Sequence, residues 1–145
     1  TAKPPYHDEV ERLGASTVLD YARGDLAAAL ADACEPSLVL GTVVDRTIET
    51  DAEVLAPGGR IVAIGNTEPT VAFPMGPGKG KDIRLQAMSM FNTPDTSAVL
   101  SRLAGMVARE DIEPVVAREY PIDDIDDAHR DVLTDSVLGK FVVRT

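Results

Sequence analysis

The residues best placed to do chemistry follow a short apolar run. Residues 61–64 are Ile, Val, Ala and Ile, and residues 65–67, Gly-Asn-Thr, come directly after them. The run follows a Pro-Gly-Gly turn at residues 57–59 that ends a helix, and it is too short to be a helix itself. Ligands of parallel sheets bind beyond the carboxyl ends of the strands. We therefore expect a small-molecule site at residues 65–67, where Gly65 permits a close backbone approach.

Groups that perform covalent or metal chemistry are scarce in this chain. Cys34 is the single cysteine, and the two histidines have no second His or Cys at a metal-ligand spacing. No nucleophile stands beside a base, so the pattern assigns no catalytic residue and predicts no metal site. A single cysteine also excludes an internal disulfide, which favours a reducing cytoplasm as the location.

Charge narrows the classes of partner. The 145 residues carry 24 acidic and 14 basic side chains, a net charge of −10. A strongly negative field argues against nucleic acid or an anionic membrane surface as the partner. No apolar run approaches the roughly 20 residues of a membrane span. A small-molecule substrate is the expected partner.

The site needs strands and helices to position it, and the sequence alternates between them. Asp25 and Thr93 are expected to cap two of the helices, because side-chain oxygens of these types accept the free N–H groups of a first turn. The alternation of strands and helices along the chain predicts an α/β fold with a doubly wound parallel sheet. A segment rich in Gly and Pro, residues 74–81, is expected to be a loop, and Pro77 makes it a poor phosphate cradle. The expected strands are residues 17–21, 38–40, 60–65 and 83–91, and the expected helices are residues 7–13, 25–34, 48–55 and one after Thr93.

The last part of the chain has a different organisation. Residues 114–120 and 140–144 are predicted strands, and residues 123–134 between them form an amphipathic helix whose first turn is acidic. This strand-helix-strand segment either extends the first sheet or belongs to another domain.

Six short stretches, in this order and spacing, carry a resemblance to a known family. They are Thr1-Ala2, HDEVERLGA at residues 7–15, VLDY at 18–21, LAPGGR at 55–60, Ala128-His129 and LGKFVV at 138–143. Together they resemble the carboxyl-terminal half of a medium-chain dehydrogenase/reductase of the zinc-type alcohol dehydrogenase and quinone oxidoreductase kind. The resemblance implies an incomplete Rossmann cofactor domain over residues 1–112. It also implies that residues 113–145 return to a GroES-like catalytic domain.

The resemblance implies that hydride passes from NADPH to a quinone or an enone. The family's glycine-rich phosphate turn would lie before Thr1 and is not in this sequence. NADP is expected rather than NAD, because residues 1–3 offer no carboxylate for the ribose hydroxyls, whereas Lys3 and Tyr6 suit a 2′-phosphate. The other implied cofactor contacts are Tyr21 at the adenosine phosphate, Thr42 and Val43 at the nicotinamide ribose, Gly65 and Asn66 at the nicotinamide, and Phe91, Asn92 and Lys140 around the pocket.

Two alternatives remain open from the sequence. A class I methyltransferase that binds S-adenosylmethionine also places a Pro-Gly-Gly turn before a strand, although its glycine-rich first loop and acidic strand end are missing here. A non-catalytic α/β module is the second alternative. In either the oxidoreductase or the module, the apolar side chains of residues 114–145 need a partner surface, so we expect a homo-oligomer.

Overall fold

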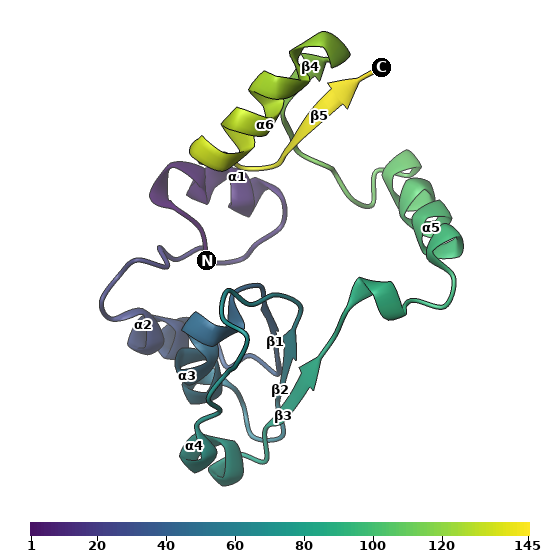
Figure 1. Cartoon of the computed structure of the whole chain (residues 1–145). Helices are drawn as coiled ribbons and strands as arrows, with labels where there is room; N and C mark the ends of the chain where they lie inside the picture. The colour runs from purple at the N-terminus through teal and green to yellow at the C-terminus, as the bar shows by residue number, and fades with distance from the viewer. The chain divides into compact units, whose positions relative to one another are not determined.

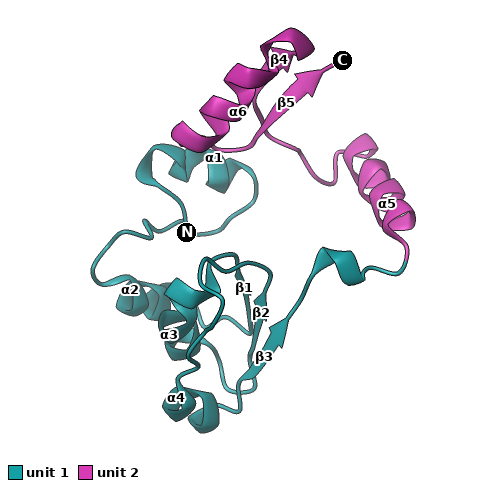
Figure 2. Cartoon of the chain, in the orientation of Figure 1, with its two compact units in different colours: residues 1–94 teal, residues 95–145 magenta.

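In a computed structural model, which describes residues 1–145, the chain forms α-helices and short parallel strands (Figure 1). It divides into two compact units, unit 1 (Thr1–Pro94) and unit 2 (Asp95–Thr145), which Figure 2 colours separately. No helix is both long enough and apolar enough to cross a bilayer.

Unit 1 is built on a three-stranded parallel sheet in the order β1-β2-β3 (Figure 1). The first residues of the strands are in register, since Leu38 pairs with Arg60 and Arg60 pairs with Arg84. The predicted α/β fold with a parallel sheet is thereby confirmed. The strands are β1 (Leu38–Gly41), β2 (Arg60–Ala63) and β3 (Arg84–Ala87).

The core of unit 1 lies between helix α3 (Val44–Val54) and the sheet. Ile48, Ala52 and Leu55 of this segment pack with Ile61 of β2, and Ala52 and Ile61 are fully buried. Burial of this apolar cluster is what holds α3 on the sheet. The helices of unit 1 are α1 (His7–Arg12), α2 (Leu26–Ala33), α3 (Val44–Val54) and α4 (Met75–Gly80), with 3-10 helices η1 (Pro4–Tyr6) and η2 (Met90–Asn92).

The fourth strand predicted at residues 17–21 is wrong. This segment makes one isolated parallel bridge, between Asp20 and Ala2, although Val18 is buried. Pro4 and Pro5 follow shortly after Ala2 and lack the N–H groups that a longer ladder would require.

The loop predicted at residues 74–81 is also wrong, because this segment forms helix α4. Pro77 lies in the first turn, where a backbone N–H has no partner within the helix. The ring of Phe73 fills the space beside Gly78, where a Cβ atom would lie 2.3 Å from it. The ammonium group of Lys81 donates to the carbonyls of Glu53 and Leu55, the latter at 2.8 Å, and so satisfies the end of α3.

Several element boundaries differ from the predicted ones. Helix α3 begins at Val44, four residues before the predicted start, and β3 ends at Ala87 instead of continuing to residue 91. Asp95, not Thr93, caps the next helix by accepting the N–H of Ala98 at 2.8 Å. Asp25 makes no side-chain cap, since its carboxylate pairs with Arg23 at 2.6 Å.

Unit 2 contains its own two-stranded parallel sheet, and helix α6 (Ile125–Thr134) connects its two strands along the chain. The predicted strand, helix and strand are confirmed, and they form a sheet separate from that of unit 1. The domain boundary expected near residue 112 stays a prediction. The elements of unit 2 are α5 (Thr96–Ala108), β4 (Val116–Pro121), the 3-10 helix η3 (Ile122–Asp124), α6 (Ile125–Thr134) and β5 (Lys140–Arg144).

A mixed aromatic and ionic cluster fastens α6 to the sheet of unit 2. The hydroxyl of the buried Tyr120 donates to Asp131 at 2.7 Å, and Arg118 reaches Asp135 at 3.1 Å. The ring of Phe141 meets that of Tyr120 edge to face, with 5.7 Å between the centroids. Because β4, β5 and α6 all contribute, this cluster ties the three elements together.

Candidate functional site

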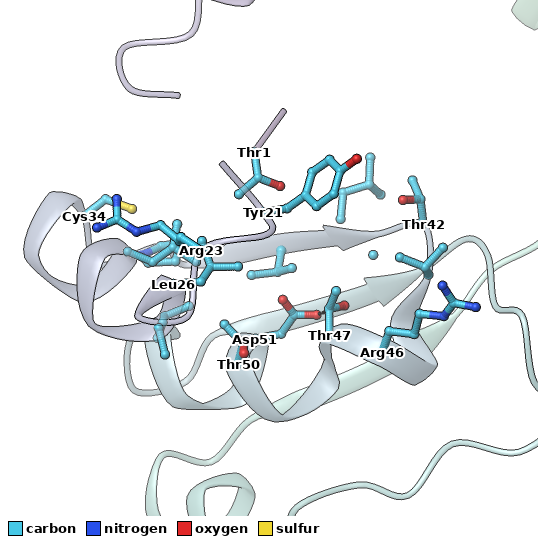
Figure 3. A pocket seen from close by; sticks show the side chains of 18 of the residues that line it. Thr1, Tyr21, Arg23, Leu26, Cys34, Thr42, Arg46, Thr47, Thr50 and Asp51 are labelled. Atoms are coloured by element: carbon cyan, nitrogen blue, oxygen red, sulfur yellow. Dashed lines mark hydrogen bonds between the residues drawn. The ribbon is translucent and has the colours of Figure 1, made fainter. Parts of the chain in front are cut away.

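One cavity of unit 1, which we name the edge cavity, lies beside β1. It has a volume of about 940 Å³ and is bordered by α2, β1 and α3. Thr42 and Val43, directly after β1, line it together with Tyr21. Figure 3 shows Thr1 and Tyr21 on one side of the strand and the side chains of α3 on the other. Three of the ten predicted cofactor residues therefore share one cavity.

A second and smaller cavity, which we name the strand-end cavity, lies at the carboxyl ends of β2 and β3. Its volume is about 260 Å³, and Gly65 and Asn66 line it with Val44, Leu85 and Met88. Residues that follow β2 therefore border a cavity at the carboxyl edge of the sheet, which is the usual place of ligands in parallel sheets.

The segments after β1 and β2 touch each other at Gly65. A Cβ atom on Gly65 would lie 2.2 Å from the carbonyl oxygen of Thr42, a distance that no side chain can accommodate. The N–H of Val44 donates to the carbonyl of Gly65 at 3.1 Å, and the N–H of Gly65 donates to Gly41 at 3.3 Å. Glycine is thus required here by space, and the segments that follow β1 and β2 pack directly against each other.

Asp45 links these two segments, and it was not identified from the sequence. Its two carboxylate oxygens accept the N–H of Thr67 at 2.7 Å and the hydroxyl of Thr67 at 2.6 Å. Both hydrogen bonds hold the pKa of Asp45 below its usual value, and the bond from the Thr67 hydroxyl contributes more than the bond from the Thr67 N–H. A carboxylate in the first turn of a helix that follows a strand is the signal that points to such a residue.

Asp51 presents a second carboxylate, on the side of α3 that borders the edge cavity (Figure 3). It is 9% exposed and accepts one hydrogen bond, from the hydroxyl of Thr47 at 2.8 Å. Burial raises the pKa of Asp51, and the Thr47 bond offsets part of that rise. Arg46, which lines the same cavity, was likewise not identified from the sequence.

Replacing Asp51 by Asn is expected to stabilise the protein at neutral pH. The raised pKa means that the folded state disfavours the charged carboxylate. Ionisation of Asp51 therefore lowers the free energy of unfolding above the folded pKa, and this loss disappears below the unfolded pKa of about 3.9. The amide can still accept the Thr47 hydroxyl. We expect Asp51→Asn to have a higher Tm than wild type at pH 7 and no advantage at pH 3. Asp32→Asn, an exposed change on α2, is the control, and a lower Tm for Asp51→Asn at pH 7 would contradict the argument.

The remaining predicted cofactor residues lie outside both cavities. Lys3 is exposed and precedes η1, and Tyr6 is half-buried and precedes α1. Phe91 and Asn92 form η2 instead of ending a strand, and Phe91 is 89% exposed. Lys140 begins β5 of unit 2 and donates its N–H to the carbonyl of Val115. The contacts of these five residues with a cofactor stay predictions.

A family model described as zinc-binding dehydrogenase matches residues 13–143, almost the whole chain. The chain belongs to the zinc-binding dehydrogenase family. This membership confirms the resemblance to medium-chain dehydrogenases and reductases, and it favours the oxidoreductase interpretation over a methyltransferase. A search of curated proteins found no match.

Solved structures of this superfamily share the fold. A protein of Sinorhizobium meliloti 1021, provisionally named an alcohol dehydrogenase, is 25% identical with a TM-score of 0.84, and 98% of this chain aligns with 39% of that one. The quinone oxidoreductase of Thermus thermophilus is 24% identical with a TM-score of 0.79, at 99% and 47% coverage. The quinone oxidoreductase of Pseudomonas syringae pv. Tomato DC3000 is 21% identical with a TM-score of 0.78, at 100% and 47% coverage. The chain thus spans less than half the length of these structures.

The family's description implies zinc, but the side chains of these 145 residues do not fit it. No group of three or more His, Cys, Asp or Glu side chains is arranged to hold a metal ion, and Cys34 is exposed. Zinc sites in proteins need three or four such ligands.

Proposed function

We propose that this chain is the cofactor-binding portion of an NADPH-dependent oxidoreductase that reduces a quinone or an enone. The observation that carries the proposal is the contact of Gly65 with the carbonyl of Thr42, beside the edge cavity. It brings the backbones of the segments after β1 and β2 together at the carboxyl edge of the sheet, which is where ligands of parallel sheets bind. The nicotinamide, when bound, would supply the hydride.

In this proposal, different residues at the carboxyl edge of the sheet contact different parts of the cofactor. Thr42, Val43, Gly65 and Asn66 would contact the nicotinamide and its ribose, and Tyr21 would lie at the adenosine phosphate. The family membership and the cavity shared by Tyr21, Thr42 and Val43 support this assignment. The quinone oxidoreductase of Thermus thermophilus was solved in complex with NADPH.

Lys3 is the residue that we propose to favour NADPH over NADH. It is exposed, and no acidic side chain stands within residues 1–3 to accept the ribose hydroxyls. An ammonium group attracts the 2′-phosphate that distinguishes the two cofactors.

Fluorescence titration of the purified chain with NADPH and NADH tests the proposal. We expect tighter binding of NADPH, and we expect Lys3→Glu to weaken NADPH more than NADH because only NADPH carries the 2′-phosphate. Lys79→Glu, with the same charge change on an exposed position of α4, is the matched control and should leave the preference unchanged. A preference for NADH in the wild type, or an equal loss for both cofactors in Lys3→Glu, would contradict the assignment.

We also propose how the protein assembles, which domain its last residues belong to and where in the cell it is located. Self-association through unit 2 is supported by exposed apolar side chains, with Val132 at 59% and Leu133 at 86% exposure. Residues 113–145 would belong to the catalytic domain of the longer enzyme. The single Cys34 supports a cytoplasmic location.

A further inference from the structure

Two segments that border different cavities meet at the carboxyl edge of the unit 1 sheet. Thr42 and Val43 line the edge cavity, whereas Gly65 and Asn66 line the strand-end cavity. The distance between these two segments therefore decides how a ligand that touches both would fit.

Asp45 connects the two segments without lining either cavity. It lies in the first turn of α3, directly after the segment that follows β1. Its carboxylate holds Thr67, 22 residues away, through both the backbone N–H and the hydroxyl, at 2.7 and 2.6 Å. Using both oxygens on one residue fixes the orientation as well as the distance of the segment that carries Gly65.

The electrostatics keep this link charged at neutral pH. The Thr67 hydroxyl and N–H lower the pKa of Asp45, and the nearby Arg46 acts in the same direction. The positive end of a helix also favours a carboxylate in its first turn. The Asn66 amide donates to the carbonyl of Glu68 at 2.9 Å, a local bond that spans Thr67.

We infer that Asp45 is the positioning residue for the nicotinamide end of the cofactor site. This inference rests on the proposed function. Asp45 acts through Thr67, Gly65 and Thr42, and it touches no ligand itself. Its removal therefore affects the part of the cofactor that contacts both segments and spares the adenosine half.

Comparing two ligands separates positioning from general stability. The probes are NADPH and the adenosine bisphosphate fragment of NADPH, which lacks the nicotinamide, each titrated by calorimetry into the intact chain. Two lost hydrogen bonds to a charged group predict that Asp45→Ala weakens NADPH by about tenfold or more. Binding of the fragment should stay within about twofold of wild type. Asp45→Asn and Thr67→Val, which each keep part of the link, should lie between.

The matched control is Glu49→Gln, which removes an exposed carboxylate one turn further along α3. It should bind both probes as the wild type does. Amide hydrogen exchange adds a measurement that needs no ligand, since the Thr67 N–H should exchange faster in Asp45→Ala and not in Glu49→Gln.

The outcomes distinguish the inference from the function on which it rests. Equal weakening of both probes in Asp45→Ala, or unchanged NADPH binding, overturns the positioning role while the proposed function stands. If the wild type binds neither probe, the proposed function fails, and the positioning role fails with it, even if Thr67 exchange shows that the link itself exists.

Discussion

Replacing Ile61 by Ala is expected to lower the free energy of unfolding of unit 1 by about 2–5 kcal/mol, the range for large-to-small changes in a closed core. Ile61 is fully buried in β2, the central strand, which pairs with β1 and β3. Its side chain packs in the core cluster with residues of α3. Its removal takes apolar contact from Leu55 and Ile48 and leaves a cavity that the short sheet cannot close. Urea denaturation followed by circular dichroism measures the loss as a lower midpoint.

Ile64→Ala is the matched control for this prediction. Ile64 directly follows β2 in the same unit and is 41% exposed, so the same chemical change should cost about 1 kcal/mol or less. Similar losses for both variants would show that the cluster around Ile61 is not the core that stabilises unit 1.

Replacing Gly65 by Ala is expected to separate the two segments at the carboxyl edge of the sheet. The added Cβ would lie 2.2 Å from the Thr42 carbonyl oxygen, and because that neighbour is backbone, the chain itself must move. Overpacking of this kind costs about 1–3 kcal/mol. Under the proposed function, NADPH affinity falls as well, by about tenfold or more, which corresponds to at least about 1.4 kcal/mol. Denaturation and NADPH titration measure the two losses separately.

Gly76→Ala tests whether space, and not the loss of glycine as such, is responsible. Gly76 lies in α4, and a Cβ atom there meets nothing within 4 Å. Alanine is the better helix former, so this variant should be as stable as the wild type or slightly more stable, with unchanged cofactor binding. Wild-type stability in Gly65→Ala would mean that the contact with Thr42 does not constrain the edge.

The parallel sheet of unit 1 was predictable because its signals are local. The Pro-Gly-Gly turn before β2 and the apolar runs at residues 38–40 and 61–64 need no knowledge of distant partners. The same is true of β5, where the predicted residues 140–144 are those of the strand.

The wrong predictions share a physical cause, which is that a strand or a loop depends on its neighbours. Residues 17–21 have strand-forming side chains, but their one ladder partner is Ala2, which two prolines soon follow. The Gly- and Pro-rich residues 75–80 have the composition of a loop, yet the ring of Phe73 and the lysine link from Lys81 to the end of α3 accompany a helix there.

The sequence by itself determined the α/β class, the family and the place of Gly65 at a strand end, because turn residues and apolar runs report on local backbone. Only the tertiary structure decided that Gly65 lies against Thr42, that Asp45 holds Thr67, and that Asp51 is buried at a cavity. The Asp45 link joins residues 22 positions apart. Such contacts depend on how a helix packs on a sheet. The periodicity of apolar residues predicts which face of an element is buried, but not which distant residues meet there.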